Sequence, residues 1–206
     1  MRRRILLENK IVPEKYVDLG LPSGLLWATG NLVKITQANY SIGAETDWGT
    51  YISWGNIIGY NEGAGYDFNQ TKYDSTSGKR VTADIPSNDA SHDIALAKLG
   101  TPWHLPTKGD FDELYDNTDS SWTTINGVSG RKFMKKSDHS VYAFFPASGY
   151  YSSTSLSFRG TDGYYWSSSY NSPTYAYDLW FSSSKVTPTH DYVRRLGLTV
   201  RPVRTI

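Results

Sequence analysis

The chain contains 206 residues, of which 38% are hydrophobic and 20% are charged, and its formal net charge is +1. This length and composition suit a folded chain with a core rather than a disordered polymer. The small net charge excludes a general attraction to nucleic acid or to anionic membranes, and no apolar run approaches the roughly 20 residues that cross a bilayer. We therefore expect neither a nucleic-acid partner nor membrane insertion.

The sequence has no cysteine, which excludes disulfides, thiolate metal sites and cysteine nucleophiles but leaves the redox compartment open. Aromatic residues make up 15% of the chain, with 16 Tyr and 7 Trp beside 7 Phe. Side chains that combine an apolar body with a polar tip suit surfaces that meet a wet or polar partner. Loop-rich folds with shallow cores have the same composition, so the aromatic content alone leaves both interpretations open.

The beginning of the chain differs from the rest. Arg2, Arg3 and Arg4 precede a short apolar run that the polar residues 8–10 end, so we expect either that no standard export signal is used or that one has been removed. We expect residues 1–14 to be a solvated N-terminal arm. Residues 15–206 contain neither a low-complexity linker nor a repeat, which predicts a single domain.

The first half of the domain predicts few regular elements. Two strands, over residues 16–19 and 25–31, flank the turn-forming residues 21–24. A stretch dense in Gly, Asp, Asn and Tyr follows from residue 39 to residue 85, and its composition predicts loops.

Two short helices are expected next. Residues 87–89 can cap the first helix, which stops before Gly100. Thr107 and Asp110 have the spacing of a capping box, with Asp in place of the usual Glu, and they open a second helix through Leu114.

After residue 119 the pattern is all strand and turn. The Asn-Gly dipeptide at 126–127 is a strong hairpin signal. Strands are predicted over residues 131–135, 141–145, 164–168, 176–181 and 198–201. Elements in this order predict an α+β fold, in which two short helices pack on short antiparallel sheets connected by long loops.

No catalytic constellation is visible in the sequence. It lacks the nucleophile-elbow, zinc-protease, P-loop and dinucleotide motifs, and its four histidines are too widely spaced for a metal-ligand pattern: His92, His104, His139 and His190. His92 and His104 suit structural roles, and we expect no catalytic residue and no cofactor. Loop carboxylates such as Asp67 or Asp74 could hold a structural calcium ion, although a solvated polar loop is the favoured interpretation.

Five ordered blocks resemble a known family. They lie at 17–28, at 103–107 with 111–114, at 145–150, at 163–168 and at 197–203, and they read VDLGLPSGLLWA, WHLPT with FDEL, FPASGY, GYYWSS and GLTVRPV. These blocks resemble those of the major paralogous domain proteins of gut and rumen Bacteroidetes and Fibrobacter. The resemblance covers nearly the whole chain, from about residue 16 to residue 203.

That resemblance implies a C-type-lectin-like fold of the formylglycine-generating-enzyme type. The chemistry of those enzymes needs active-site cysteines, which this chain lacks. The calcium-dependent sugar motifs of animal C-type lectins, Glu-Pro-Asn or Gln-Pro-Asp followed by Trp-Asn-Asp, are also absent. The family further overlaps the variable proteins of diversity-generating retroelements, in which a reverse transcriptase rewrites adenines in the C-terminal coding segment.

The segment between Trp166 and Gly197 is rich in Ser, Tyr, Thr, Asn, Asp and His. Substituting adenines in an Asn codon reaches these residue types, and they form a good contact alphabet, because Tyr supplies rigid area while Ser and Asn supply adaptable hydrogen bonds. An ordinary polar, loop-rich member of the family would have the same composition. The composition is therefore compatible both with a diversified surface and with an undiversified one.

The contact surface is predicted within this segment. Alternation in a strand would place Tyr175, Tyr177, Leu179 and Phe181 on one face, which we expect to be exposed, and Trp180 on the inner face with Ala176 and Asp178. The predicted ligand-binding residues are Tyr170, Ser172, Thr174, Tyr175, Tyr177, Leu179, Phe181, Ser183, Lys185, Thr187, Thr189, His190, Asp191, Tyr192, Arg194 and Arg195.

The resulting hypothesis is a non-enzymatic, C-type-lectin-like binding domain over residues 15–206. Its partner would be a protein or glycan on another cell surface, and its place would be a phage particle or an extracellular surface. A structural or adhesin domain of a bacterial surface or fimbrial assembly, without diversification, is the alternative. A degenerate enzyme of the formylglycine-generating type is a third and weaker hypothesis.

Overall fold

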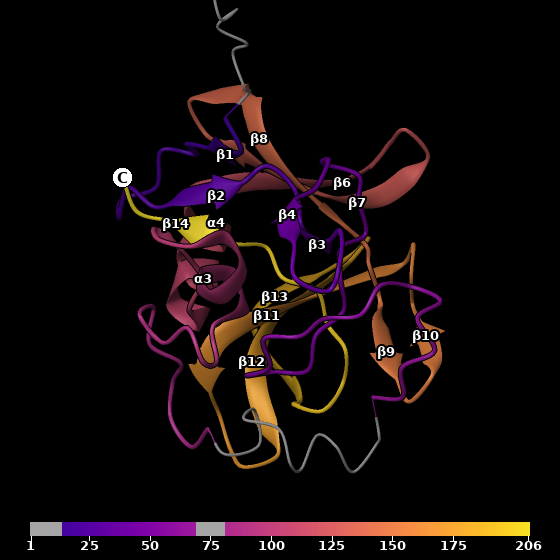
Figure 1. Ribbon diagram of the computed structural model, residues 1–206. Coiled ribbons are helices and arrows are strands. Elements are labelled where there is room, and N and C mark those ends of the chain that lie inside the picture. The colour runs from indigo at the N-terminus through magenta and orange to yellow at the C-terminus, as the bar shows by residue number, and fades with distance from the viewer. Residues whose placement is uncertain (1–13, 69–80) are drawn as a thin grey trace, which may run out of the picture.

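Small antiparallel sheets dominate the computed structural model of the chain, which describes residues 14–68 and 81–206 (Figure 1). Two helices, α3 and α4, lie in the described part of the chain. The prediction of an α+β fold with short antiparallel sheets and little helix is confirmed. The predicted arm lies outside the described residues except for residue 14.

The first and last described strands share one sheet. Its strands, in spatial order, are β1 (Tyr16–Val17), β2 (Leu26–Ala28), β14 (Val203–Arg204) and β5 (Trp103–His104). β14 pairs antiparallel with β2 and with β5, so segments far apart in sequence meet here. Strands occur where the sequence predicts 16–19 and 25–31, but both are shorter. A hairpin of β3 (Leu32–Lys34) and β4 (Tyr40–Ile42) follows.

The helix α3 (Ile94–Leu99) begins later than predicted, because Asp93 and not the segment 87–89 is its cap. The fully buried Asp93 carboxylate accepts hydrogen bonds from the backbone N–H of Leu96 at 3.0 Å and of Leu105 at 2.8 Å. One side chain thus satisfies a free helix donor and ties the helix to the approach to α4. Gly100 ends the helix as predicted, with φ of 75°.

The helix α4 (Lys108–Asn117) has the predicted capping box. The Thr107 hydroxyl accepts from the Asp110 N–H at 3.1 Å, and the Asp110 carboxylate accepts from the Thr107 N–H at 2.7 Å. Two N-terminal donors are therefore satisfied locally, and Phe111 and Leu114 are turned into the core.

A three-stranded meander follows α4. It consists of β6 (Thr118–Ile125), β7 (Val128–Lys135) and β8 (Asp138–Pro146). Asn126 and Gly127 adopt φ of 48° and 81°, the left-handed pair that a tight hairpin needs, so that turn is confirmed. The predicted strands 131–135 and 141–145 lie within β7 and β8, whereas β6 was not predicted.

The C-terminal region forms a second three-stranded sheet beside a short hairpin. The sheet has the order β11 (Asp162–Tyr170), β12 (Tyr175–Ser182) and β13 (Val186–Val193), and the hairpin pairs β9 (Tyr150–Ser152) with β10 (Ser155–Ser157). The predicted strands 164–168 and 176–181 lie within β11 and β12. The predicted strand 198–201 is wrong, because Leu198 and Thr199 make single bridges to Ile52 and Tyr165.

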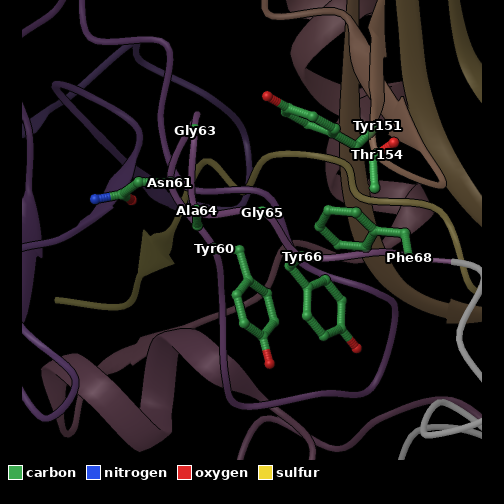
Figure 2. Close-up of a pocket in the computed structure, with 9 residues that line it drawn as sticks. All are labelled: Tyr60, Asn61, Gly63, Ala64, Gly65, Tyr66, Phe68, Tyr151 and Thr154. Atoms are coloured by element: carbon green, nitrogen blue, oxygen red, sulfur yellow. The ribbon is translucent and has the colours of Figure 1, made fainter.

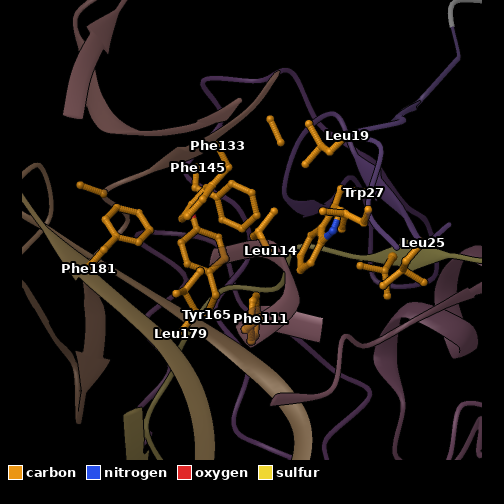
Figure 3. Close-up of a cluster of buried hydrophobic side chains, with 14 residues drawn as sticks. Leu19, Leu25, Trp27, Phe111, Leu114, Phe133, Phe145, Tyr165, Leu179 and Phe181 are labelled. Carbon is orange, nitrogen blue, oxygen red and sulfur yellow. The ribbon is translucent and has the colours of Figure 1, made fainter. Parts of the chain in front are cut away.

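Two buried clusters hold these sheets together. The first joins Trp27 and α4 to β7, β8 and one face of β11 and β12; Figure 3 shows its side chains. The second surrounds Trp54 and Trp166. Core positions for Trp27, Trp54 and Trp166 are as predicted, whereas Trp103 is half-buried.

A buried arginine joins the two terminal segments. The guanidinium of Arg201 donates to the Asn31 side-chain oxygen at 2.9 Å and to the Ala28 carbonyl at 3.0 Å, and it also donates to the Phe144 carbonyl. Burial lowers the pKa of Arg201 to about 10, so the group remains charged at neutral pH. The planar fork bonds the segment of residues 28–31 and β8 at once, which fixes their positions relative to the C-terminal segment.

Candidate functional site

The two faces of β12 match the prediction only in part, since Ala176 and Asp178 are buried on the predicted inner face. Residues do alternate along the strand, but Leu179 and Phe181 are fully buried while Trp180 is half-buried. The prediction that Leu179 and Phe181 are exposed is therefore wrong. The physical reason is tertiary: the odd-numbered face packs against Phe133, Phe145 and Tyr165 of the first cluster.

An extra residue in β13 determines what lies opposite β12. The partner of Asp178 is His190 and that of Trp180 is Thr187, so two residues of β13 face the single Leu179. This β-bulge brings Thr187 and His190 to the same face of the sheet as Trp180. Across the sheet, Tyr164 pairs with Trp180, which adds a third strand to this face.

Six aromatic side chains form a continuous surface there, which we name the aromatic face: Tyr150, Phe158, Tyr164, Trp180, His190 and Tyr192. Their ring centroids lie 5.0 Å apart for Tyr150–Tyr192, 5.4 Å for Tyr164–Tyr192, 5.6 Å for His190–Tyr192, 5.8 Å for Trp180–His190 and 5.9 Å for Tyr150–Phe158. The rings come from β9, from the loop after β10 and from all three strands of the sheet. Tertiary packing therefore assembles a surface that no single segment contains.

The six rings of the aromatic face differ in their exposure to solvent. Phe158 is 55% exposed and Tyr164 is buried, while the other four rings are half-buried. The Trp180 indole N–H donates to Asp162 at 3.0 Å, and the Lys185 ammonium lies 5.7 Å from the centre of the Trp180 ring. Half-buried rings with bonded polar tips keep a fixed orientation while they still present area to a partner.

A carboxylate lies beneath the rings. Asp178 is fully buried, and one of its oxygens lies 2.8 Å from His190 Nδ1, while its Oδ2 has no hydrogen-bond partner among the described residues. Burial raises the pKa of Asp178 to about 6, against the opposite effect of His190. Burial alone would lower the pKa of His190, but the hydrogen bond and charge of Asp178 outweigh it and the net shift is upward. The pair holds a proton tightly and orients the imidazole.

The sixteen predicted contact residues separate into three groups. Leu179, Phe181 and Arg194 are buried. The half-buried group is Tyr170, Ser172, Tyr177, Thr187, His190 and Tyr192, and the exposed group is Thr174, Tyr175, Ser183, Lys185, Thr189, Asp191 and Arg195.

Arg194 is a correction to the prediction that it offers donors at an edge. Its guanidinium donates to the carbonyls of Ser172, Pro173 and Val81, and it lies 4.4 Å from the centre of the Trp54 ring. A planar cation stacked on an indole and bonded to carbonyls is a structural group. It fixes the turn between β11 and β12.

The remaining predicted residues do not share one surface. His190 and Tyr192 lie on the aromatic face, with Lys185 over its Trp180. Tyr177 lies on the opposite face, where the Lys108 ammonium of α4 is 4.9 Å from its ring centre. Tyr175 shares that opposite face and is 40% exposed.

Four members of the aromatic face were not among the predicted contact residues: Tyr150, Phe158, Tyr164 and Trp180. Tyr150 and Tyr164 belong to blocks assigned to the scaffold, and Trp180 was assigned to the inner face. The usable signal was the concentration of Tyr and Trp on both sides of residue 160, but it does not say which rings meet.

The described residues contain no group of three or more His, Asp or Glu side chains that could hold a metal ion. Asp67 accepts a hydrogen bond from the Ser153 hydroxyl at 2.8 Å, and Asp74 lies outside the described residues. His92 Nδ1 lies 2.6 Å from Asp89, and His104 Nδ1 lies 2.9 Å from the Leu105 carbonyl, so both histidines contact groups close to them in the chain. Among the described helices, none is long and apolar enough to cross a membrane.

The chain thus has an α+β fold of small antiparallel sheets with an aromatic surface on its C-terminal sheet. Residues 113–203 match the model of a protein family described as Domain of unknown function (DUF8237). The matched segment begins within α4 and ends at β14, so it contains every strand from β6 to β13. No curated protein and no solved structure matches the chain.

Proposed function

We propose that the protein is a non-enzymatic binding module that contacts a protein or glycan on another cell surface through the aromatic face. The observation that carries this proposal is the unbroken contact of six aromatic side chains at the surface of one sheet. Partly exposed aromatic area of this kind, with bonded polar tips, is typical of binding hot spots. Because the rings are held before a partner arrives, little side-chain freedom is lost on binding.

The Asp178–His190 pair supports the same proposal. Its carboxylate is buried below the rings and its imidazole is part of the surface, so the pair couples the position of His190 to the sheet. A catalytic role would need a group to receive or give a proton at the imidazole. The proposal instead assigns the pair to orientation of a contact residue.

We further propose that the fold is C-type-lectin-like and that the protein is a variable protein of a diversity-generating retroelement. The resemblance of the five sequence blocks supports both parts. The exposure of Thr174, Ser183, Thr189 and Asp191 is compatible with substitution, whereas Leu179, Phe181 and Arg194 would belong to the constant scaffold. A template repeat that matches the codons of 164–201 and differs at adenines, next to a reverse transcriptase gene, is the test. If no such repeat is found, the retroelement part of the proposal is wrong and a binding module without diversification remains.

Binding is tested by screening the full chain on protein and glycan arrays. The double variant Trp180→Ala/Tyr192→Ala should lose the partners that the unchanged protein captures, and near- and far-ultraviolet circular dichroism would verify its fold. Tyr175→Ala is the matched control, because it removes an exposed tyrosine from the opposite face. If Tyr175→Ala abolishes capture while the double variant retains it, the aromatic face is not the contact surface. If nothing is captured and the protein assembles with itself, the results favour the alternative of a structural domain in a surface or fimbrial assembly.

A further inference from the structure

A second aromatic site lies on the other side of β9. Tyr150 of this strand belongs to the aromatic face, whereas the next residue, Tyr151, lines a pocket with a volume of about 180 Å³. Figure 2 shows the pocket, with Tyr60, Tyr66 and Phe68 along one loop and Thr154 beside Tyr151. The two sites are therefore neighbours that do not share a side chain.

The aromatic walls of this pocket support one another. Tyr60 and Tyr66 stack with ring centroids 3.6 Å apart and an interplanar angle of 7°. Phe68 meets Tyr66 edge to face at 4.9 Å and stacks against Tyr151 at 5.7 Å. A pocket whose walls are stacked rings keeps its shape without a ligand.

Glycine shapes the rim and the base. Gly63 and Gly65 have φ of 75° and 67°, a left-handed conformation that lets the loop turn tightly and leaves backbone at the rim. At the base, a Cβ on Gly197 would lie 2.5 Å from the Phe68 ring, so the absence of a side chain there is what admits Phe68. The backbone N–H of Phe68 also donates to the Ser153 carbonyl at 3.1 Å, which ties the loop to the β9–β10 turn.

The lining of the pocket is uncharged. Its polar groups belong to the backbone of 63–65 and to the side chains of Tyr60, Asn61, Tyr66, Tyr151 and Thr154. The Asn61 amide already donates to the Lys34 carbonyl and accepts from the Thr50 hydroxyl. Nearby, Glu62 forms an ion pair with Arg159, so its charge is compensated outside the lining. Aromatic walls in a lining that also contains hydroxyl-bearing residues favour a neutral ring that has an apolar face and a polar edge.

The size of the pocket limits the ligand further. Pockets that enclose drug-sized molecules measure roughly 300–1,000 Å³. A volume of about 180 Å³ therefore fits a single ring and not an extended molecule. A neutral sugar ring combines C–H faces that stack on tyrosine with hydroxyls at its edge.

We infer that this pocket is a second binding site, for one neutral pyranose residue of a glycan. This second site does not rest on the function proposed for the aromatic face, because the aromatic face could bind a protein while the pocket binds a sugar. The alternative occupant of the same shape is an aromatic side chain of a protein, and the experiment includes a probe for it.

The test titrates the full chain with methyl glycosides of glucose, galactose, mannose and N-acetylglucosamine, followed by saturation-transfer and amide-shift NMR. At least one of these neutral glycosides should bind with about millimolar affinity, as expected for so small a ligand. The methyl glycoside of N-acetylneuraminic acid should bind about tenfold more weakly, because no cationic side chain lines the pocket and the nearby Lys34 ammonium is already bonded to the Gly59 carbonyl.

Two variants locate the binding. Tyr66→Ala removes one wall and should weaken binding about tenfold or more. Thr154→Trp changes an exposed position and should block the pocket, so it tests the site without removing a packed ring. Trp180→Ala should leave sugar affinity unchanged, which separates this site from the aromatic face.

The inference is overturned if no neutral glycoside binds, or if binding survives both Tyr66→Ala and Thr154→Trp. Binding that Trp180→Ala alone abolishes would place the sugar on the aromatic face and also overturn it. N-acetyltyrosinamide that binds more tightly than every glycoside, with the same response to the variants, would assign the pocket to an aromatic side chain.

Discussion

The sheet of β11, β12 and β13 has one closed face and one face that is open only in part, because Trp166, Ala176 and Asp178 on it are fully buried. On the closed face, Tyr165, Leu179 and Phe181 are fully buried against α4 and the β6–β8 meander. On the open face, half-buried rings cover the Asp178 carboxylate, which orients the His190 imidazole. The difference shows that neighbouring residues of one strand serve separate tasks. The closed face supplies stability by apolar packing, which leaves the open face free to hold a polar arrangement that packing alone would not favour.

Phe181→Ala should have the largest effect on stability, because it empties a fully buried ring site on the closed face. We expect the free energy of unfolding to fall by about 3–5 kcal/mol, measured by urea unfolding followed by fluorescence. Leu179→Ala should behave similarly at about 2–5 kcal/mol. A loss below about 1 kcal/mol for Phe181→Ala would mean that this face is not a packed core.

Arg194→Ala tests the residue that moved from the predicted contact surface to the interior. Its loss leaves three carbonyls without their donor and removes the cation stacked on Trp54. We expect a decrease in unfolding free energy of about 2–4 kcal/mol. Arg195→Ala, at the adjacent exposed position, is the control and should change stability by less than about 1 kcal/mol. Equal effects would argue that Arg194 has no special structural role.

The Asp178–His190 pair should make stability depend on pH in a defined direction. Both folded-state pKa values are raised, so the folded protein binds protons more tightly than the unfolded chain, and the pair's contribution is fully present below about pH 4. It is lost as pH rises through about 6 for Asp178 and above 6.5 for His190. A shift from 3.8 to about 6 corresponds to at most about 3 kcal/mol.

Asp178→Asn isolates this contribution, because it keeps the shape and removes the titration. The variant should gain stability relative to the unchanged protein as pH rises from 4 to 7, measured by urea unfolding at each pH. Asp116→Asn, at an exposed position of α4 away from the pair, should leave the pH profile nearly unchanged. Parallel profiles for Asp178→Asn and the unchanged protein would rule out this role of the pair.

Trp180→Ala should have the smallest effect on stability in this series. The Trp180 ring is half-buried, and the substitution also removes its hydrogen bond to Asp162. We therefore expect the free energy of unfolding to fall by about 1–2 kcal/mol. Its effect on partner capture should be much larger. A loss as great as that of Phe181→Ala would show that the open face is as much core as the closed one.

Local signals in the sequence identified local structure well. The capping box of Thr107 and Asp110 and the turn at Asn126 and Gly127 depend on neighbouring residues, and both form as predicted. Asp93 was missed as a helix cap because its carboxylate also bonds Leu105, a contact between separate segments. The strand β13 was missed because Pro188 and several polar residues give it no alternating pattern.

The candidate site was predictable only in part. Alternation along β12 follows from strand geometry, but which side is buried depends on α4 and the meander, which no local pattern reveals. His190 and Tyr192 were predicted as contacts. Their association with Tyr150 and Phe158 requires the β9–β10 hairpin to lie against the sheet, and the β13 bulge that aligns His190 with Trp180 has no clear signature.

The pairing of β2 with β14 has a consequence for how such a domain can be carried. The two strands are adjacent, with Arg201 bonded to residues beside them, and in Figure 1 they lie above the sheet of β11, β12 and β13 that carries the aromatic face. Domains whose ends lie close together tolerate insertion into a loop of another protein. This geometry would let a larger protein hold the domain through the side that contains β2 and β14, with the aromatic face turned outward.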